Sequence, residues 1–186
     1  PSGAYLFALD QTIDDDNVGN SMGNGDGLSD AGETIELRVT LKNNGSGSES
    51  LITANLSTAD PYLNLIDNAA GYSNLAPGAS AAPNDPFLIE ISPNAPDRLE
   101  ARCTLTVLAS GGTYQQEIVL YVHAPIFNYY SQAVRDSVGN GDGNGVILNN
   151  EDFAIVPRIR NFGLGEAVGV EVRLRSNDPA VTITDS

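Results

Sequence analysis

Hydrophobic and polar residues alternate along several short stretches of this chain. Between Thr34 and Leu41 every second residue is a large aliphatic one, which is the period of a half-buried β-strand. The same alternation recurs at residues 52–56, 103–107, 118–122 and 170–174. Turn-forming residues separate these stretches, and none has the period of a long amphipathic helix. About seven short strands in roughly 120 residues predict an all-β fold, specifically an immunoglobulin-like β-sandwich.

An internal repeat divides the sequence. The run Gly23-Asn24-Gly25-Asp26-Gly27 returns as Gly139-Asn140-Gly141-Asp142-Gly143, at an offset of 116 residues. Landmarks further along share an offset of 118: Glu33 and Glu151, Asn43 and Asn161, Asp60 and Asp178. The second copy therefore carries two additional residues between its Gly-Asp-Gly and its glutamate.

The repeat predicts two tandem modules of unequal completeness. The first occupies residues 1–124, and the second occupies residues 125–186 and corresponds only to the first half of a module. Half a sandwich has unpaired strand edges and is poorly stable alone. We therefore expect the second module to be completed by further residues of the same polypeptide or by a neighbouring chain.

The composition narrows the possible functions. The chain has 24 acidic and 9 basic residues and a formal net charge of −15, which argues against nucleic acid and anionic membranes as partners. No run of about 18 apolar residues exists, so membrane insertion is not expected. A single cysteine and a single histidine exclude an internal disulfide framework and a multi-histidine metal site.

An enzymatic role is not expected. Cys103 could act as a nucleophile with His123 as its base, but Cys103 falls on the inward face of an alternating stretch. A buried thiol in the hydrophobic core is the favoured interpretation.

The second glycine-rich loop has the spacing of a calcium site. Asn140 to Glu151 spans twelve residues, with oxygen-bearing side chains at positions 1, 3 and 5, a glycine at 6 and a glutamate at 12. Such spacing wraps oxygen ligands around Ca²⁺, and the terminal glutamate can bind through both oxygens. A strand pattern follows Glu151 where a true EF-hand has a helix, so we expect a structural site between strands, not a sensor.

The first copy does not fit the same twelve-residue register, because Asn24 to Glu33 spans ten residues. A shifted register places Met22 at the first position, where a thioether is a poor calcium ligand. The acidic run at residues 14–16 could supply the missing oxygen. A flexible turn would explain one copy, but recurrence with a downstream glutamate favours a cation site. The candidate ligands are Asp15, Asp16, Asn24, Asp26, Leu28, Asp30 and Glu33 in the first copy, and Asp136, Asn140, Asp142, Asn144, Val146 and Glu151 in the second.

These motifs resemble a known group of modules. The glycine-rich loop followed by Gly32-Glu33, the stretch from Ile35 to Gly45, Asp60-Pro61-Tyr62, Leu75-Ala76-Pro77-Gly78 and Asp85-Pro86-Phe87 are similar to the tandem immunoglobulin-like, CARDB-like modules of large secreted bacterial proteins. Many such proteins are gingipain-like peptidases or surface proteins whose modules lie outside the catalytic domain. The resemblance implies a noncatalytic, calcium-binding and extracellular or cell-surface role.

Three functions remain open at this point. The favoured one is a calcium-stiffened spacer or adhesion region of a larger secreted or surface protein, whose partner is another surface protein or a glycan. A second is a subunit of an extracellular filament or surface layer in which a neighbouring chain completes the second module. The third is a carbohydrate-binding module, weakly supported by Tyr129 and Tyr130.

Overall fold

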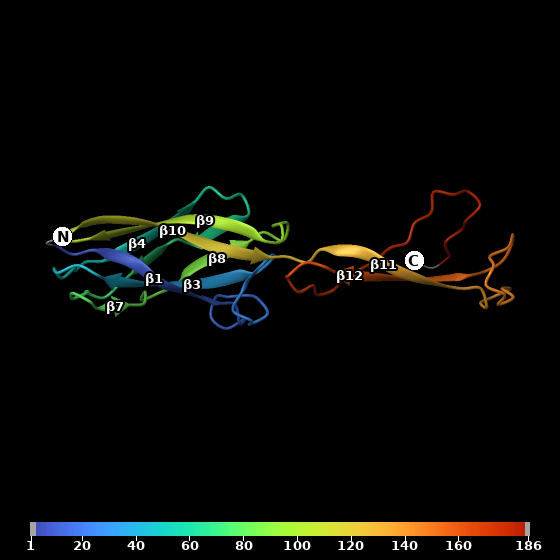
Figure 1. The fold of residues 1–186 in the computed structure, drawn as a ribbon, viewed down its shortest axis with the longest axis horizontal. Helices are drawn as coiled ribbons and strands as arrows, with labels where there is room; N and C mark the ends of the chain where they lie inside the picture. Colours follow the sequence, from blue (N-terminus) through green and yellow to red (C-terminus); the bar gives the residue numbers. More distant parts are fainter. Residues whose placement is uncertain (1–2, 185–186) are drawn as a thin grey trace.

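The computed structural model describes residues 3–184 and is built from β-strands and loops alone over that range. Two units lie end to end along the long axis (Figure 1). We call residues 3–124 the N-terminal unit and residues 125–184 the C-terminal unit. Within the described residues, there is no helix of the length and apolarity that a membrane span requires. The predicted all-β class is confirmed.

One sheet of the N-terminal unit runs in the order β1-β3-β8-β5, and β7 pairs with β3 beside β8. Its strands are β1 (Leu6–Asp14), β3 (Thr34–Asn43), β5 (Leu63–Asp67), β7 (Ser80–Ala81) and β8 (Phe87–Ile91). All neighbouring strands are antiparallel. The strand predicted from Thr34 to Leu41 is therefore confirmed as β3, near the middle of this sheet.

The second sheet has the order β2-β10-β9-β4-β6. Its strands are β2 (Ser29–Asp30), β4 (Thr53–Thr58), β6 (Ala69–Gly71), β9 (Leu99–Ala109) and β10 (Gly112–His123). The short β2 runs parallel to the last two residues of β10, Val122 and His123. Through this pairing, the loop that contains β2 is held at the end of β10, where the C-terminal unit begins.

The hydrophobic core lies between these two sheets, as expected for a β-sandwich. The inward positions of the predicted strands are buried: Leu37, Leu105 and Leu120 are each 0% exposed, and Cys103 is 1% exposed. Each fully buried leucine contributes about 1.5 to 3 kcal/mol relative to an exposed one. The alternation in the sequence thus accounts for the core of this unit.

The C-terminal unit contains a single antiparallel pair, β11 (Phe127–Arg135) and β12 (Ala154–Asn161). The strand predicted at residues 170–174 is wrong, since no strand forms there. Its counterpart in the N-terminal unit, β4, is hydrogen-bonded along β9. The described residues of the C-terminal unit include no equivalent of β9, and an alternating stretch without a partner strand stays irregular.

The β1–β3 and β11–β12 pairs are closed by the same asparagine clamp. Asn43 accepts the N–H of Tyr5 at 3.2 Å, and Asn161 accepts the N–H of Ile126 at 2.9 Å. Each asparagine oxygen also accepts the N–H two residues further along, at 3.0 and 2.9 Å. The equivalence of these asparagines, 118 residues apart, extends from the sequence to their hydrogen bonds.

The edge of β12 that faces away from β11 lacks one backbone N–H donor. Phe162 donates its N–H to Ile126 at 2.8 Å, so even-numbered residues of this segment face β11. Because successive residues of a strand direct their N–H groups to opposite sides, Pro157 faces the open edge, where it has no N–H to offer. Val39 is at the equivalent position of β3, between the residues that pair with β8 and those that pair with β7.

Asp97 joins the two units. Its Oδ1 accepts the N–H of Ala124 at 3.1 Å and the N–H of Leu164, from the turn after β12, also at 3.1 Å. These hydrogen bonds lower the pKa of Asp97 below its ordinary value although burial acts in the opposite direction. A single carboxylate therefore holds both the last residue of the N-terminal unit and the turn after β12 in the C-terminal unit.

Candidate metal centres

The glycine-rich segments form two loops, each wrapped around a buried aspartate. We call residues 15–33 the first loop and residues 136–151 the second loop. Asp15 is 1% exposed and accepts the N–H groups of Gly25 and Gly27, each at 2.9 Å. Asp136 is 7% exposed and accepts the N–H of Gly145 at 2.6 Å. In both loops the upstream aspartate organises the turn that follows it.

A glutamate closes each loop from the other end. Glu33 accepts the N–H of Asn24 at 3.0 Å through Oε1 and the N–H of Asp30 at 3.2 Å through Oε2. Glu151 accepts the equivalent pair, from Asp142 at 3.0 Å and from Leu148 at 2.6 Å. The downstream glutamates predicted from the repeat therefore occupy the same place in both loops.

These hydrogen bonds relate the two loops by an offset of 118, not 116. Asn24 accepts the N–H of Asp26 at 2.9 Å, and Asp142 accepts that of Asn144 at 3.0 Å. The next bond also matches, since Asp26 accepts the N–H of Leu28, and Asn144 accepts that of Val146, at 2.9 and 2.7 Å. The expected pairing of Asn24 with Asn140, and the two additional residues in the second copy, are corrected.

The reason for this correction is chemical. Counted from the glutamate, the first loop reads Gly-Asn-Gly-Asp-Gly and the second reads Gly-Asp-Gly-Asn-Gly. Aspartate and asparagine form the same side-chain turn, because either can accept a backbone N–H two residues ahead. Aligning identical residue types therefore shifted the sequence alignment by two residues, although the part of the loop from the glycine-rich run to the glutamate has the same length in both copies.

Glycine is required where each loop passes its aspartate. A Cβ atom built on Gly23 would lie 2.7 Å from both the carbonyl oxygen of Asp15 and Oε1 of Glu33. On Gly141 it would collide with the carbonyl oxygen of Asp136. Any side chain here would push the loop away from the carboxylates. These two glycines thus bring the loop backbone against the acidic residues.

The second loop assembles three carboxylates. One oxygen each from Asp136, Asp142 and Glu151 lies within 4.8 Å of the others. Asp136 is buried, Glu151 is half-buried and Asp142 is exposed. This spacing fits a single metal ion, and carboxylate oxygens are the ligands that hard divalent cations take.

The first loop has the same frame with one more acid. Asp15, Asn24 and Glu33 stand at the positions of the three carboxylates, and Asp30 stands where the second loop has Leu148. Asp30 is 6% exposed, and its Oδ1 is buried without a hydrogen-bond partner. This oxygen lies 3.6 Å from Nδ1 of His123 but makes no hydrogen bond, and a buried acceptor without a hydrogen bond in an acidic loop fits an ion ligand because leaving it unsatisfied is costly.

The raised pKa values of two acids in the first loop also favour a bound cation. Burial raises the pKa of Asp30 above its ordinary value, and the negative charge of Asp26 raises it further. Burial also raises the pKa of Glu33, and Asp30 and Asp15 add to the shift, although backbone N–H groups act against it. Ionising these acids together is therefore unfavourable, and a bound cation would relieve the repulsion.

Two predicted ligands have other hydrogen-bond roles. Asp16 is exposed and accepts the N–H of Val18 at 2.8 Å, so Asp15, not Asp16, takes the place that Asp136 has in the second loop. Asn140 accepts the N–H of Asp152 at 2.6 Å and donates to the carbonyl of Asn150 at 2.8 Å. Leu28 and Val146, which are also among the candidate ligands, are exposed residues.

The first loop also lies at the junction of the two units, a placement that the sequence did not predict. Oδ1 of Asp30 is 3.6 Å from Nδ1 of His123, and the backbone N–H of Glu166 lies close enough to lower the pKa of Asp30. His123 ends β10, and Glu166 belongs to the turn that Asp97 holds. Ligand Asp30 is thus shared between the candidate site and the junction.

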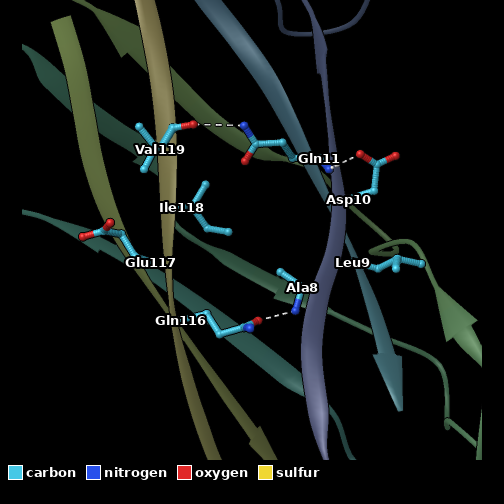
Figure 2. Close-up of a pocket in the computed structure, with 8 residues that line it drawn as sticks. All are labelled: Ala8, Leu9, Asp10, Gln11, Gln116, Glu117, Ile118 and Val119. Carbon is cyan, nitrogen blue, oxygen red and sulfur yellow. Dashed lines mark hydrogen bonds between the residues drawn. The ribbon is translucent and has the colours of Figure 1, made fainter. Parts of the chain in front are cut away.

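A shallow groove separates the edges of β1 and β10 (Figure 2). Gln11 donates to the carbonyl of Val119 at 3.0 Å, and Gln116 accepts the N–H of Ala8, so glutamine side chains bridge the two edges where backbone bonds are missing. The groove contains none of the predicted site residues. Its contacts account for the closure of this side of the sandwich.

No known protein family matches the chain, and no curated protein is similar to it. Its function must be argued from the loops and the junction.

Proposed function

We propose that the chain is a noncatalytic, calcium-stabilised region of a larger secreted or surface protein, built from immunoglobulin-like modules and serving as a spacer or adhesion segment. Two kinds of observation support this proposal. The second loop brings three carboxylate oxygens within 4.8 Å of one another and the first loop shares its hydrogen-bond frame, and the two units are joined end to end (Figure 1). The acidic surface and the resemblance to secreted bacterial modules favour an extracellular location.

The observation that carries the proposal is the exchange of charge between the loops. Asn24 in the first loop is matched by Asp142, and Asp26 is matched by Asn144. Each loop thus combines an upstream aspartate, one aspartate, one asparagine and a closing glutamate. If the loops were only turns, these four positions would have no reason to hold the same number of carboxylates, to which the first loop adds Asp30. A cation site supplies a reason, because the total negative charge of its ligands must balance the cation regardless of which position carries each carboxylate.

Calcium is the cation that best fits these ligands. Every candidate ligand is an oxygen, and neither loop contains a cysteine or histidine, which soft or borderline metals prefer. Calcium accepts six to eight oxygens in flexible arrangements, whereas magnesium requires a tighter octahedron. With a Kd of roughly 0.1 mM, about 1 mM calcium would add about 1.4 kcal/mol of stability per site.

A cation in the first loop would also stiffen the junction. Ligation would fix Asp30, which contacts both His123 of β10 and the backbone of Glu166. Asp97 already holds the same turn. Calcium therefore favours one orientation of the C-terminal unit over others, which is the property expected of a spacer.

The test is thermal unfolding in calcium and in a chelator, with the variants Glu33→Gln and Glu151→Gln. Glutamine keeps the size and one acceptor oxygen of glutamate but removes its charge. We expect the wild-type midpoint to rise in calcium and each variant to lose part of that rise. Glu49→Gln is the matched control, because Glu49 is also buried and holds loop N–H and hydroxyl groups but lies outside both sites. A wild-type midpoint that ignores calcium refutes the proposal.

A second function has an observation of its own. Ile155, Pro157 and Ile159 of β12 correspond to Leu37, Val39 and Leu41 of the N-terminal core, and Ile159 is 37% exposed. The edge that pairs with β8 in β3 is free in β12. A filament or surface-layer subunit could have this face covered by a neighbouring chain. Sedimentation velocity over a wide concentration range tests this, and a strictly monomeric protein excludes it.

A further inference from the structure

Each loop places an Asn-Gly pair beside a carboxylate. Asn24-Gly25 lies in the first loop and Asn144-Gly145 in the second, and both asparagines are exposed. The second loop has a further Asn-Gly pair, Asn140-Gly141, whose glycine N–H is donated to the carbonyl of Val138 and not to a carboxylate. Asn-Gly pairs are prone to spontaneous deamidation, because glycine leaves its nitrogen sterically open to attack by the asparagine side chain. Whether such a pair reacts depends on whether the glycine nitrogen can lose its proton and reach Cγ of the asparagine.

In the second loop the reacting groups are all held. The N–H of Gly145 is donated to Asp136 at 2.6 Å. The side chain of Asn144 accepts the N–H of Val146 at 2.7 Å and donates to Asp142 at 2.5 Å. Cyclisation requires the Gly145 nitrogen to lose its proton and the Asn144 side chain to rotate. Both hydrogen bonds to the aspartates, which are candidate cation ligands, must therefore break first.

We propose that Asn144 is a deamidation site gated by the second loop: it reacts only when Asp136 releases the N–H of Gly145, and a bound cation keeps the gate closed. The calcium dependence rests on the proposed function, whereas the role of Asp136 does not. Asp136 Oδ2 holds the glycine N–H, and its other oxygen is free for the cation.

The chemistry needs only water. The nitrogen of Gly145 attacks Cγ of Asn144, a C–N bond forms, and the bond from Cγ to Nδ2 breaks as ammonia leaves with the proton of the glycine N–H. Water then opens the resulting succinimide at one of its two carbonyls. Opening at one carbonyl gives aspartate and opening at the other gives isoaspartate, which lengthens the backbone within the loop.

The two products have opposite consequences for the site. Aspartate at position 144 reproduces Asp26 of the first loop and adds one negative charge to the three carboxylates already there. Isoaspartate displaces the N–H groups that Asp136 and Glu151 accept. An unoccupied second loop would therefore divide with time into a population that binds cations more strongly and one that has lost its site.

The first loop has a comparable contact at a different position, because Asn24-Gly25 aligns with Asp142-Gly143 and not with Asn144-Gly145. Gly25 donates its N–H to Asp15 at 2.9 Å, and Asp15 is only 1% exposed. This loop is also pinned by the pairing of β2 with β10, which the second loop lacks. We expect Asn24 to react more slowly than Asn144 when the cation is removed, because local opening costs more there.

The experiment is peptide mapping by mass spectrometry of the whole chain, aged at mildly alkaline pH with calcium or with a chelator. Opening that competes with binding is slowed by the factor 1 + [L]/Kd, about tenfold at roughly 1 mM calcium for a Kd near 0.1 mM. We expect Asn144 to deamidate about ten times faster in the chelator. Asn44-Gly45 is the internal control, since Gly45 donates to buried Asn43, remote from both loops.

Asp136→Asn separates the gate from the cation. The variant keeps a weaker acceptor for Gly145 but loses the charge, so we expect faster reaction at Asn144 than in wild type, both measured in chelator, and no protection by calcium. If calcium has no effect on wild type but Asp136→Asn still reacts faster, the gate stands and the calcium site fails. If Asp136→Asn reacts no faster than wild type, or more slowly because Asp136 acts as a base, the inference is overturned.

Discussion

The two units differ sharply in how much of their hydrophobic surface they bury. Of the 27 exposed large hydrophobic side chains among the described residues, 18 lie between Ile126 and Val181, in the smaller unit. Both units begin with similar alternating patterns and the same asparagine clamp. The difference shows that a stretch of alternating hydrophobic and polar residues can form a strand, but does so only where a partner strand is available to pair with it.

The loops do not share this difference. Each is defined by hydrogen bonds between residues fewer than thirteen apart, and these bonds form in the C-terminal unit as well as in the N-terminal one. Local side-chain turns need no distant partner. The candidate metal centres are therefore the most autonomous part of the repeat, and the sandwich is the least.

The largest expected effect is a difference in unfolding free energy between alanine substitutions at two equivalent positions, one in each unit. Leu41 is 0% exposed in the N-terminal unit, and Ile159 is its counterpart in the C-terminal unit. We expect Leu41→Ala to cost about 2 to 5 kcal/mol of unfolding free energy and Ile159→Ala less than about 0.5 kcal/mol. Urea unfolding followed by circular dichroism measures both. Equal losses would mean that β12 has a buried core of its own.

A second comparison concerns the junction. Replacing Asp97 by alanine leaves the N–H groups of Ala124 and Leu164 without their acceptor. We expect proteases to cut between residues 124 and 165 several-fold faster, with little change in the unfolding midpoint of the N-terminal core. Asp85→Ala is the control, since Asp85 is exposed in the same unit. Unchanged cleavage in Asp97→Ala would show that the units are held by other contacts.

A third effect distinguishes two of the buried glutamates of the N-terminal unit, Glu33 and Glu49, by the pH dependence of their contribution to stability. Burial opposes ionisation of Glu49, but hydrogen bonds from Ser110, Gly111 and Tyr114 outweigh it and lower its pKa below the ordinary 4.5. The stability that Glu49 contributes is therefore complete above about pH 4.5 and is lost as the pH falls through its folded pKa.

Glu33 has the opposite sign, because its folded pKa is raised. Its contribution is complete below the ordinary pKa of 4.5 and is lost as the pH rises through the folded value. In a chelator, Glu33→Gln should therefore be neutral or stabilising near pH 7, and Glu49→Gln should be destabilising. Urea midpoints across the acidic range measure this. The C-terminal unit has Glu151 as a counterpart of Glu33 but only Ala167 in place of Glu49.

The smallest expected effect lies in the β11–β12 hairpin. The guanidinium of Arg160 stacks over Tyr130 at 5.9 Å and Phe162 at 5.1 Å. Exposed contacts of this kind contribute about 0.5 to 1 kcal/mol. We expect Arg160→Ala to shift the NMR signals of Tyr130 and its neighbours without moving those of the N-terminal core. Shifts that spread across the junction would show that the hairpin is coupled to the sandwich.

The sequence predicted the N-terminal core well, because every second residue of its strands is hydrophobic and buried, as at Ile35, Leu37 and Val39. It predicted which residue types line the loops but misaligned them, since aspartate and asparagine are interchangeable in a side-chain turn. The uniform offset of 118 beyond Glu33 was the signal that could have corrected the alignment. Asp97 could not be predicted, because its two partners lie 27 and 67 residues away along the chain.

The proline in β12 gives the exposed strand a protective property. A bare strand edge with a hydrophobic face is a template on which further copies of a protein can add, one after another, into fibrils. At Pro157 that template has a gap in the middle, so a long strand cannot pair along the whole of it. Only short segments on either side of the gap can be accepted, as β8 and β7 are accepted by β3. The two-stranded sheet can therefore accept short strands but does not support indefinite growth.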